Sequence, residues 1–526
     1  MVKTKYGFVE GVPSDREDVT VFKGIPIGAT TEGAGRFCAP KEPSPWDGVR
    51  LCDKWPDRFL QEMTTREPGT FWGDEFYYDD NYDPGNSENC LAVNVYAPEN
   101  AANENGLPVF CWIHGGGFTG GYASEIEFNA SNLAAKGIIV VLIQYRLSAL
   151  GWLVTTELCK ENGGHAGNYA VLDMVHGLKW INENIKEFGG DPKKVTIAGQ
   201  SAGAFSVTML LRTPLSKGLF RNAIVQSGFN GFLNGADFGA RFSTLKDAAE
   251  AGDKAIKTVF GENASIEDVR KVSTSDLLLP REGAGAGFGG APMTRLAELT
   301  FLTGNATIDN YVFTEESVDL TRPGALDGIN IIIGGTSDEY TTLTGDFIDK
   351  MGITKDSAAG ILEKQYGKGC AELYDISDDK KAQAAHMRAG SDASFQKYLL
   401  SAGATENNKD HKTFAYYFTQ VPSGRNSEFR RAYHSSDLWY MFDSIREGAA
   451  HRNWTKEDRE TAKIMSTYWA NFVKTGDPNG EGLSNWEECT KESGYRFLQI
   501  GNGKSEMKDH TDFPERDAFF RSLYQK

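Results

Sequence analysis

The sequence lacks any pair of cysteines at metal-binding or redox spacing. Its seven cysteines are scattered and odd in number, no Cys-x-x-Cys occurs, and no Cys/His spacing suggests zinc. This excludes a zinc ribbon and a dense disulfide scaffold. We therefore expect mostly reduced, partly buried thiols in a cytoplasmic protein. The cysteines are Cys38, Cys52, Cys90, Cys111, Cys159, Cys370 and Cys489.

Long apolar runs are also missing. The longest, GIIVVLI at 137–143, is far shorter than the ~20 residues that span a bilayer. The opening MVKTKYGFVEG has no apolar core of a secretory signal. We expect no membrane partner. A secreted protein whose signal was removed stays the alternative, and four Asn-x-Ser/Thr patterns would fit it, at Asn129, Asn263, Asn305 and Asn453.

Basic residues are fewer than acidic residues. Lysine and arginine total 55 against 72 acidic residues, which gives a formal net charge of −17, and no long basic stretch offsets it. Nucleic acid is therefore not an expected partner. The acidity is expected to serve solubility, with steering of a cationic substrate as the alternative. No repeat of 20–50 residues is visible, which excludes a solenoid.

What is present is an alternation of buried strands and amphipathic helices. A helix is predicted over 166–188, where Leu172, Val175, Leu178, Ile181 and Ile185 share one face. This order predicts an α/β fold whose sheet is mostly parallel and covered by helices on both faces. We expect one domain over 1–526, with long loops at 66–89 and 281–293. The strand-like runs lie at 7–12, 19–27, 91–98, 108–118, 137–147, 194–199, 222–228 and 329–340, the run at 108–118 ending in glycines and the last in small and polar residues.

One serine is surrounded by residues with almost no side chain. The stretch TIAGQSAGAF places Ser201 after a predicted strand and before a predicted helix, with Gly199 and Gly203 on either side. The pattern Gly-x-Ser-x-Gly in that context is the nucleophile elbow of α/β-hydrolases, a strained turn that exposes the hydroxyl. The motif alone is weak in a chain with 58 glycines, and its strand–turn–helix context strengthens it.

A second glycine cluster supplies what a serine nucleophile needs for the charge that develops on an attacked carbonyl. In WIHGGGF, three glycines follow a buried strand. We expect the N–H groups of Gly116, Gly117 and Ala202 to form an oxyanion hole, each donor stabilising the transition state by roughly 3–4 kcal/mol. A plain tight turn is the alternative.

The motifs together resemble the type-B carboxylesterase family, which includes cholinesterases and bacterial para-nitrobenzyl esterases. The resemblance covers essentially the whole chain and is carried by VFKGIPIG, SENCLAVNVYAP, WIHGGGF, QYRLSALGWL, the segment 167–203 and AIVQSG. It implies the α/β-hydrolase fold with long loop insertions over the active site. It also implies hydrolysis of a carboxylic ester through an acyl-enzyme, with no metal or organic cofactor, and a small-molecule ester and water as partners.

The resemblance assigns the partners of Ser201. The family's acid lies in a segment that NIIIGGTSDEY matches, which makes Glu339 the acid and Asp338 the fallback. Its base lies in a stretch like HSSDLWYMF, which makes His434 the base. The order Ser201, Glu339, His434 is the order of nucleophile, acid and base in this fold. Ser227 is expected to support the triad from behind.

The other histidines are expected to be structural. His114 should shape the glycine loop, and His176 lies inside the amphipathic helix. The rest lie in polar or poorly patterned segments and are expected at the surface: His165, His386, His411, His451 and His510. The resemblance further implies two structural ion pairs, Arg36 with Glu88 and Arg146 with Asp173.

Two departures from the family's sequence pattern bear on the expected substrate and compartment. Cholinesterases carry a glutamate before the nucleophile, where this chain has Gln200, and the segment DRFLQ lacks the cysteine that extracellular members pair with the counterpart of Cys90. The glutamine argues against a cholinesterase, and the missing cysteine favours a reducing compartment. The aromatic loop at 66–89 suggests room for an aryl or phenolic group, so we expect a general esterase for small to medium esters. The alternatives are an amidase or carbamate hydrolase, a lipase, an acyltransferase, or a catalytically silent recognition domain like that of neuroligins.

Overall fold

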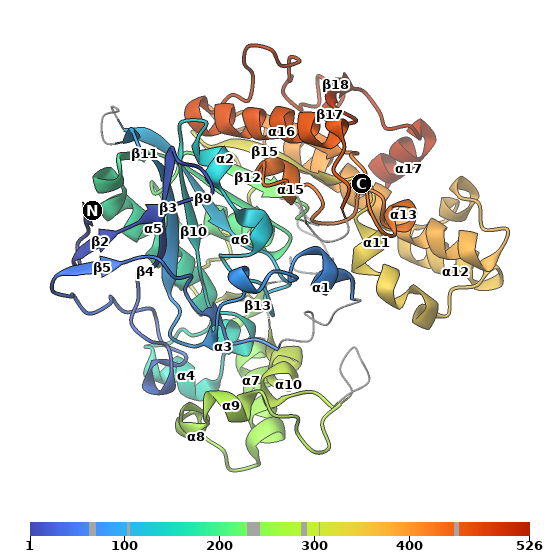
Figure 1. Cartoon of the computed structure of the whole chain (residues 1–526). Coiled ribbons are helices and arrows are strands. Elements are labelled where there is room, and N and C mark those ends of the chain that lie inside the picture. The colour runs from blue at the N-terminus through green and yellow to red at the C-terminus, as the bar shows by residue number, and fades with distance from the viewer. Residues whose placement is uncertain are drawn as a thin grey trace. The chain divides into compact units, whose positions relative to one another are not determined.

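The computed structural model describes residues 1–62, 70–101, 106–228, 242–285, 292–304, 306–446 and 452–525. Asn305, His451 and parts of the expected loops at 66–89 and 281–293 lie outside these residues. The chain divides into two compact units, and Figure 1 labels the helices and strands of both. Unit 1 comprises Met1–Arg221 and Ala236–Asp319, and unit 2 comprises Asn222–Gly235 and Leu320–Lys526. The single domain expected over 1–526 stays a prediction.

Unit 1 is built on strands in the order β11-β9-β10-β8-β4-β3. β10 pairs in parallel with β9, and β9 in parallel with β11, whereas β8 is antiparallel to both β10 and β4. Every residue of β10 is buried, as expected for the apolar run IVVLI in a strand covered on both faces. These strands are β3 (Val12–Pro13), β4 (Val19–Pro26), β8 (Ala92–Pro98), β9 (Leu107–Ile113), β10 (Ile139–Ile143) and β11 (Gly190–Gln200).

Helices pack against this sheet where the apolar periodicity places them. The helix predicted over 166–188 is α5 (Tyr169–Asn184), followed by a 3-10 turn at Ile185–Phe188. α6 (Ala202–Arg212) packs on β9 and β11, and α2 (Ser131–Ala134) packs on β4, β8 and β10. The other helices of unit 1 are α1 (Phe71–Glu75), α3 (Ser148–Trp152), α4 (Thr156–Glu161), α7 (Leu245–Phe260), α8 (Ile266–Lys271), α9 (Thr274–Leu277) and α10 (Arg295–Thr303). Its short strands are β1 (Val2–Lys3), β2 (Phe8–Glu10), β5 (Val49–Leu51), β6 (Arg58–Phe59), β7 (Asn86–Ser87), β13 (Ser243–Thr244) and β14 (Thr307–Ile308).

The two ion pairs that the resemblance implied are confirmed in unit 1. Arg36 Nη2 lies 2.5 Å from Glu88 Oε1, and Arg146 Nη2 lies 2.6 Å from Asp173 Oδ1. All four side chains are almost fully buried. Loss of one partner would leave an uncompensated buried charge, at a cost of about 3–5 kcal/mol.

Unit 2 has strands in the order β18-β17-β16-β15-β12. β15 is parallel to β12 and β16, β16 is parallel to β17, and β18 closes the edge antiparallel to β17. α13 packs on β15 and β16, and α16 packs on β17 and β18. The strands are β12 (Asn222–Gln226), β15 (Asn330–Thr336), β16 (Thr413–Phe418), β17 (Phe497–Gly501) and β18 (Lys504–Lys508). The helices are α11 (Tyr340–Leu343), α12 (Lys355–Tyr366), α13 (Asp379–Gly403), α14 (Ser427–Arg430), α15 (Leu438–Met441), α16 (Lys456–Thr475) and α17 (Pro514–Tyr524).

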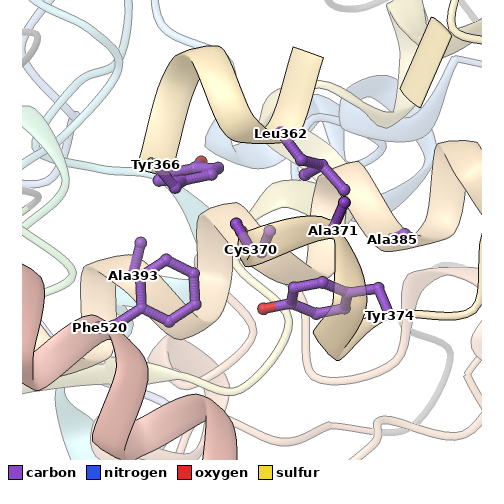
Figure 2. Packing of buried hydrophobic residues seen from close by; sticks show 9 residues of the cluster. Leu362, Tyr366, Cys370, Ala371, Tyr374, Ala385, Ala393 and Phe520 are labelled. Atoms are coloured by element: carbon purple, nitrogen blue, oxygen red, sulfur yellow. The ribbon is translucent and has the colours of Figure 1, made fainter. Parts of the chain in front are cut away.

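An apolar cluster fixes α13 against the neighbouring helices of unit 2 (Figure 2). Leu362 and Tyr366 of α12 and Phe520 of α17 pack around Ala389 and Ala393 of α13. The rings of Tyr366 and Phe520 meet edge to face, with 5.4 Å between their centroids. Because α13 also packs on β15, this cluster gives the strand that precedes Glu339 a rigid support.

Candidate active site

Ser201 occupies a strained corner between β11 and α6. Its backbone has φ +56° and ψ −124°, a conformation that residues with a side chain rarely adopt. A Cβ on Gly199 would lie 2.3 Å from the carbonyl oxygen of Gly203, and one on Gly203 would lie 2.1 Å from that of Ile113. Only glycine fits at either position, so the turn that the sequence predicts is confirmed.

The glycine loop after β9 reaches the same corner. A Cβ on Gly115 would lie 2.8 Å from the carbonyl oxygen of Gln200 and 3.2 Å from Cβ of Ser201. Gly116 and Gly117 both have positive φ, +98° and +63°. The carbonyl of Gly116 accepts the N–H of Gly120 at 2.9 Å, which folds the loop into a tight turn. The loop can therefore bring bare backbone beside the serine.

The amide of Ala202 is the next candidate donor at this corner. Ala202 is buried and opens α6, and the first amides of a helix have no partner within the helix. The positive end of the helix dipole points the same way, which favours negative charge at this position. Gln200, the last residue of β11, is buried directly before the serine.

Gln61 holds the far end of the glycine loop, a role that no sequence pattern indicates. Its side-chain amide donates to the carbonyl of Gly121 at 3.0 Å, and its side-chain oxygen accepts the N–H of Gly121 at 3.0 Å. Gln61 is buried. It ends the segment DRFLQ, which was notable only for the missing cysteine. Two reciprocal hydrogen bonds from one side chain fix the loop backbone in place.

His114 shapes the loop as expected. Burial lowers the pKa of His114 to about 4, so the ring is neutral near pH 7. The ring stacks on Tyr145 with 4.4 Å between centroids, and the Tyr145 hydroxyl donates to the carbonyl of His114 at 2.8 Å. His176 likewise makes a structural contact, with Nε2 2.6 Å from the carbonyl of Ile27. One expectation is wrong: His386 is buried in α13 rather than at the surface, because it lies on the face of α13 that packs inward.

Glu339 and His434 meet within unit 2. Glu339 follows β15, is fully buried, and its Oε2 makes a short contact with Nδ1 of His434. Its other oxygen, Oε1, accepts the hydroxyl of Ser227 at 2.6 Å and the N–H of Thr336 at 2.9 Å. Both carboxylate oxygens are thus engaged, which fixes the orientation of the imidazole. Ser227 therefore contacts the expected acid, and its support of the triad stays a prediction.

A second buried carboxyl lies close to this pair and was missed from the sequence. Asp437 accepts hydrogen bonds from the Tyr416 hydroxyl at 2.9 Å and from the Gln226 side chain at 3.1 Å. Burial, with the negative charge of Glu339, raises the pKa of Asp437 to about 6. The stretch HSSD contains Asp437, but nothing in the sequence distinguishes it from a surface aspartate.

The site residues fall into two groups. Ser201, the glycine loop, Gln200 and Ala202 belong to unit 1, whereas Ser227, Glu339 and His434 belong to unit 2. Each group is assembled within its own unit, and the meeting of Ser201 with His434 stays a prediction. Within the described residues, no group of three or more His, Cys, Asp or Glu side chains could hold a metal ion. No helix in the described part of the chain is long and apolar enough to span a membrane.

The chain is similar to known esterases over its whole length. The model of the carboxylesterase family matches residues 1–519. Para-nitrobenzyl esterase of Bacillus subtilis is 31% identical over 538 residues, covering 99% of this chain and 99% of that protein. Fumonisin B1 esterase of Sphingopyxis macrogoltabida is 30% identical over 524 residues, covering 95% of this chain and 87% of that protein. The solved structure of carboxylesterase EST55 of Geobacillus stearothermophilus matches with a TM-score of 0.76 and 26% identity, covering 99% of both chains.

Proposed function

The chain belongs to the carboxylesterase family and is a carboxylic ester hydrolase, and we propose that Ser201, His434 and Glu339 carry out its reaction. It has the expected α/β-hydrolase fold, a mixed sheet with helices on both faces. The observation that carries the proposal is the backbone of Ser201, which keeps a strained conformation at the end of a buried strand. Strain of this kind persists where function requires the exposed side chain.

In the first step, His434 removes the hydroxyl proton as the oxygen of Ser201 attacks the ester carbonyl. Nδ1 of the imidazole faces Glu339, so Nε2 is the atom that takes the proton. The ionised acid stabilises the imidazolium that forms. His434 then gives the proton to the departing alcohol, which leaves an acyl group on Ser201.

The negative charge on the carbonyl oxygen is stabilised by backbone amides. We assign this role to the N–H groups of Gly116, Gly117 and Ala202, each worth roughly 3–4 kcal/mol to the transition state. In the second step, His434 removes a proton from water, which attacks the acyl group and releases the acid. The chain's own residues suffice for both steps without a metal or organic cofactor.

We propose small to medium carboxylic esters, including aryl or phenolic ones, as substrates. One relative is named for para-nitrobenzyl esters, whose alcohol group carries an aromatic ring. In the segment after residue 70, the partly exposed ring of Trp72 stacks on the buried ring of Phe76 with 5.7 Å between centroids. Flat apolar rings of this kind bind aryl groups well.

We also propose a cytoplasmic location, with neither nucleic acid nor membrane as a partner. All seven cysteines lie in the described part of the chain as free thiols. Asn129, one of the four glycosylation patterns, is buried and uses its amide to donate to Asp15 and Tyr82. The charge of −17 supports the absence of nucleic acid.

The test is an ester panel assayed with the wild type and Ser201→Ala, together with covalent labelling by an organophosphate. The variant should lose at least about three orders of magnitude in kcat and all labelling. Undiminished turnover in Ser201→Ala would remove Ser201 as the nucleophile. Labelling without ester turnover would favour an amidase, a carbamate hydrolase or an acyltransferase. A rate that rises steeply with acyl chain length would favour a lipase, and no labelling would favour a silent recognition domain.

A further inference from the structure

The loops that carry Glu339 and His434 run side by side in register. Asp338 forms a parallel bridge with Tyr433, and its N–H donates to the carbonyl of Ala432 at 3.0 Å. The bridged residues directly precede Glu339 and His434. The contact between the acid and the base therefore lies one residue beyond an isolated bridge, and it depends on the two loops keeping this pairing.

A second connection holds the two loops beyond the bridge. The hydroxyl of Thr341 donates to the carbonyl of Arg430 at 2.7 Å, and Nη1 of Arg430 donates to the carbonyl of Thr341 at 2.6 Å. Both residues are buried. These two reciprocal hydrogen bonds join the loops beside the bridge, and the side chain of Asp338 makes a further connection.

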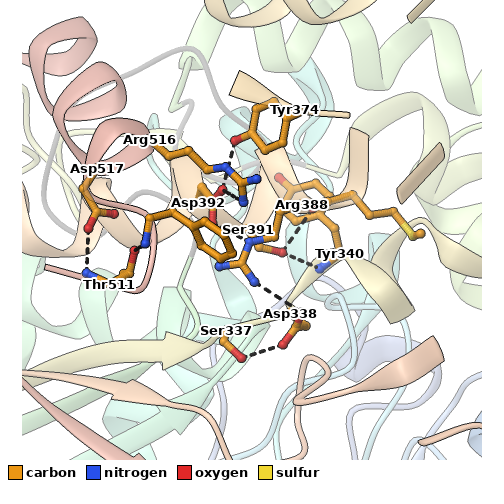
Figure 3. A network of polar contacts seen from close by, with 12 residues as sticks. Ser337, Asp338, Tyr340, Tyr374, Arg388, Ser391, Asp392, Thr511, Arg516 and Asp517 are labelled. Carbon is orange, nitrogen blue, oxygen red and sulfur yellow. Dashed lines mark hydrogen bonds and ion pairs between the residues drawn. The ribbon is translucent and has the colours of Figure 1, made fainter. Parts of the chain in front are cut away.

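The carboxylate of Asp338 forms ion pairs with two arginines, Arg431 and Arg388, and Figure 3 shows the contact with Arg388. Its Oδ1 accepts Nε of Arg431 at 3.0 Å and Nη1 of Arg388 at 3.4 Å, and its Oδ2 accepts the hydroxyl of Ser337 at 2.5 Å. Asp338 is 5% exposed. The carboxylate of Asp338 is thus engaged by these three partners, whereas Glu339 is the carboxylate that contacts His434.

One of these two arginines, Arg431, has a strained backbone and lies close to the base along the chain. Arg431 follows α14 with φ +54° and ψ −139°, and it precedes His434 by three positions. Such a conformation costs of order 1–3 kcal/mol and persists only when its surroundings enforce it. The ion pair with Asp338 is a direct restraint on this residue.

The other cation joins the loop to the rigid core of unit 2. Arg388 lies on α13 and donates from Nε to Asp392 at 2.7 Å and from Nη2 to the hydroxyl of Tyr417 at 3.1 Å. Asp392 also accepts the hydroxyl of Tyr374 at 2.9 Å (Figure 3). Arg388 therefore links Asp338 to α13, the helix that the apolar cluster of Figure 2 holds in place.

We propose that Asp338 is a positioning residue for the reaction: through Arg431 and Arg388 it keeps the loop of His434 in register with Glu339. The inference rests on the proposed function, because it assumes that His434 is the base. It assigns a role to the residue that the sequence offered only as a spare acid. A small displacement of the imidazole lowers the rate of proton transfer but leaves substrate binding almost unchanged.

The test uses Asp338→Asn and Arg431→Gln, singly and together. Asp338→Asn keeps the shape and the backbone bridge and removes the charge, and the Arg431 side chain is 57% exposed, so its replacement should not unfold the protein. Each single variant should lower kcat about 10- to 100-fold. KM should stay within about twofold, because the substrate contacts are unchanged. The double variant should be no slower than the slower single variant, because both changes remove the same contact.

The matched control is Arg496→Gln, which removes another arginine of unit 2 with its two carboxylate contacts, both at 2.6 Å. It should leave kcat at the wild-type value. Wild-type kcat in Asp338→Asn and Arg431→Gln, even with a lowered melting temperature, would overturn the inference and reduce the ion pair to a structural role. Failure of the proposed function is recognised separately, by full activity in Ser201→Ala.

Discussion

The two units contribute different kinds of chemical group to the candidate site. Unit 1 uses backbone: a strained serine, glycines with positive φ and the first amide of a helix. Unit 2 uses buried side chains: a carboxylate with both oxygens engaged, an imidazole and a network of charges. The backbone groups of unit 1 should therefore be displaced when side-chain volume is added beside them. The side chains of unit 2 should lose their function when a charge or a proton is removed.

The largest effect is expected from removing the charge of the acid in unit 2. Glu339→Gln keeps the shape but leaves Nδ1 of His434 without its carboxylate, and an amide at this place favours the wrong tautomer. In the serine protease that serves as the template for this chemistry, the matching change lowers kcat about 10⁴-fold. We expect a loss of about 10³- to 10⁴-fold in ester turnover, measured at saturating substrate.

The control for this variant is Ser227→Ala, which removes one hydrogen bond to Glu339 and keeps the charge. It should lower kcat only about tenfold, the equivalent of one hydrogen bond to a charged group. Equal effects of the two variants would mean that the acid acts by its hydrogen bonds alone, against the contrast drawn between the units.

In unit 1, the largest effect should come from added volume at the corner. Gly203→Ala places a Cβ 2.1 Å from the carbonyl oxygen of Ile113, so the backbone must move. We expect a loss of at least about 3 kcal/mol in the free energy of unfolding, measured with urea, because the close contact is with backbone. The control is Gly360→Ala on α12, where a Cβ meets open space. It should stabilise the helix by roughly 0.5–1 kcal/mol. Similar melting temperatures for the two variants would contradict the steric argument.

A smaller effect is expected at Gln61. Gln61→Leu removes both hydrogen bonds to Gly121 and leaves two buried backbone groups unpaired, at about 1–3 kcal/mol each. The glycine loop should loosen, and kcat should fall about tenfold as the oxyanion donors lose their alignment. Gln383→Leu, which removes only an exposed hydrogen bond to Asp349, should leave kcat unchanged. Wild-type kcat in Gln61→Leu would show that the loop holds its shape without this side chain.

The smallest effect concerns two carboxyl groups buried in unit 1 near the glycine loop. Glu125 and Glu127 share a hydrogen bond, with Tyr77 and Tyr122 around them and Glu75 close by. Burial raises the pKa of Glu125 from 4.5 to about 7, and it raises the pKa of Glu127 well above its ordinary value. A buried carboxyl with a raised pKa is compatible with the fold while it is protonated. Its contribution to stability is therefore fully present below about pH 4.5 and is lost as the pH rises through 7.

The wild type should therefore lose stability between about pH 5 and pH 8, and Glu127→Gln should flatten this dependence, because one buried carboxyl no longer ionises. Urea unfolding at several pH values measures the effect. Glu481→Gln, at an exposed position, should leave the curve unchanged. Parallel curves for the wild type and Glu127→Gln would show that the pair does not control the pH dependence.

Much of the site could be predicted because its residues leave local marks in the sequence. Gly199 and Gly203 mark the corner of Ser201, and the three glycines after β9 mark the loop, since each requirement is satisfied within a few residues. Glu339 and His434 have no such mark. The resemblance assigned them, and their contact joins loops 95 positions apart in the chain.

Local patterns in the sequence were enough to predict the alternation of strands and helices up to β15, the corner of Ser201 and the type of chemistry, because periodicity and steric exclusion act over short stretches. The folded chain was needed to show that Asp338 pairs with arginines, that Gln61 holds Gly121 and that Asp437 lies buried beside the acid. Each of these depends on burial and on partners from distant segments, which no local pattern records. The physical reason is that a charged or amide side chain looks the same in the sequence whether it faces water or a buried partner.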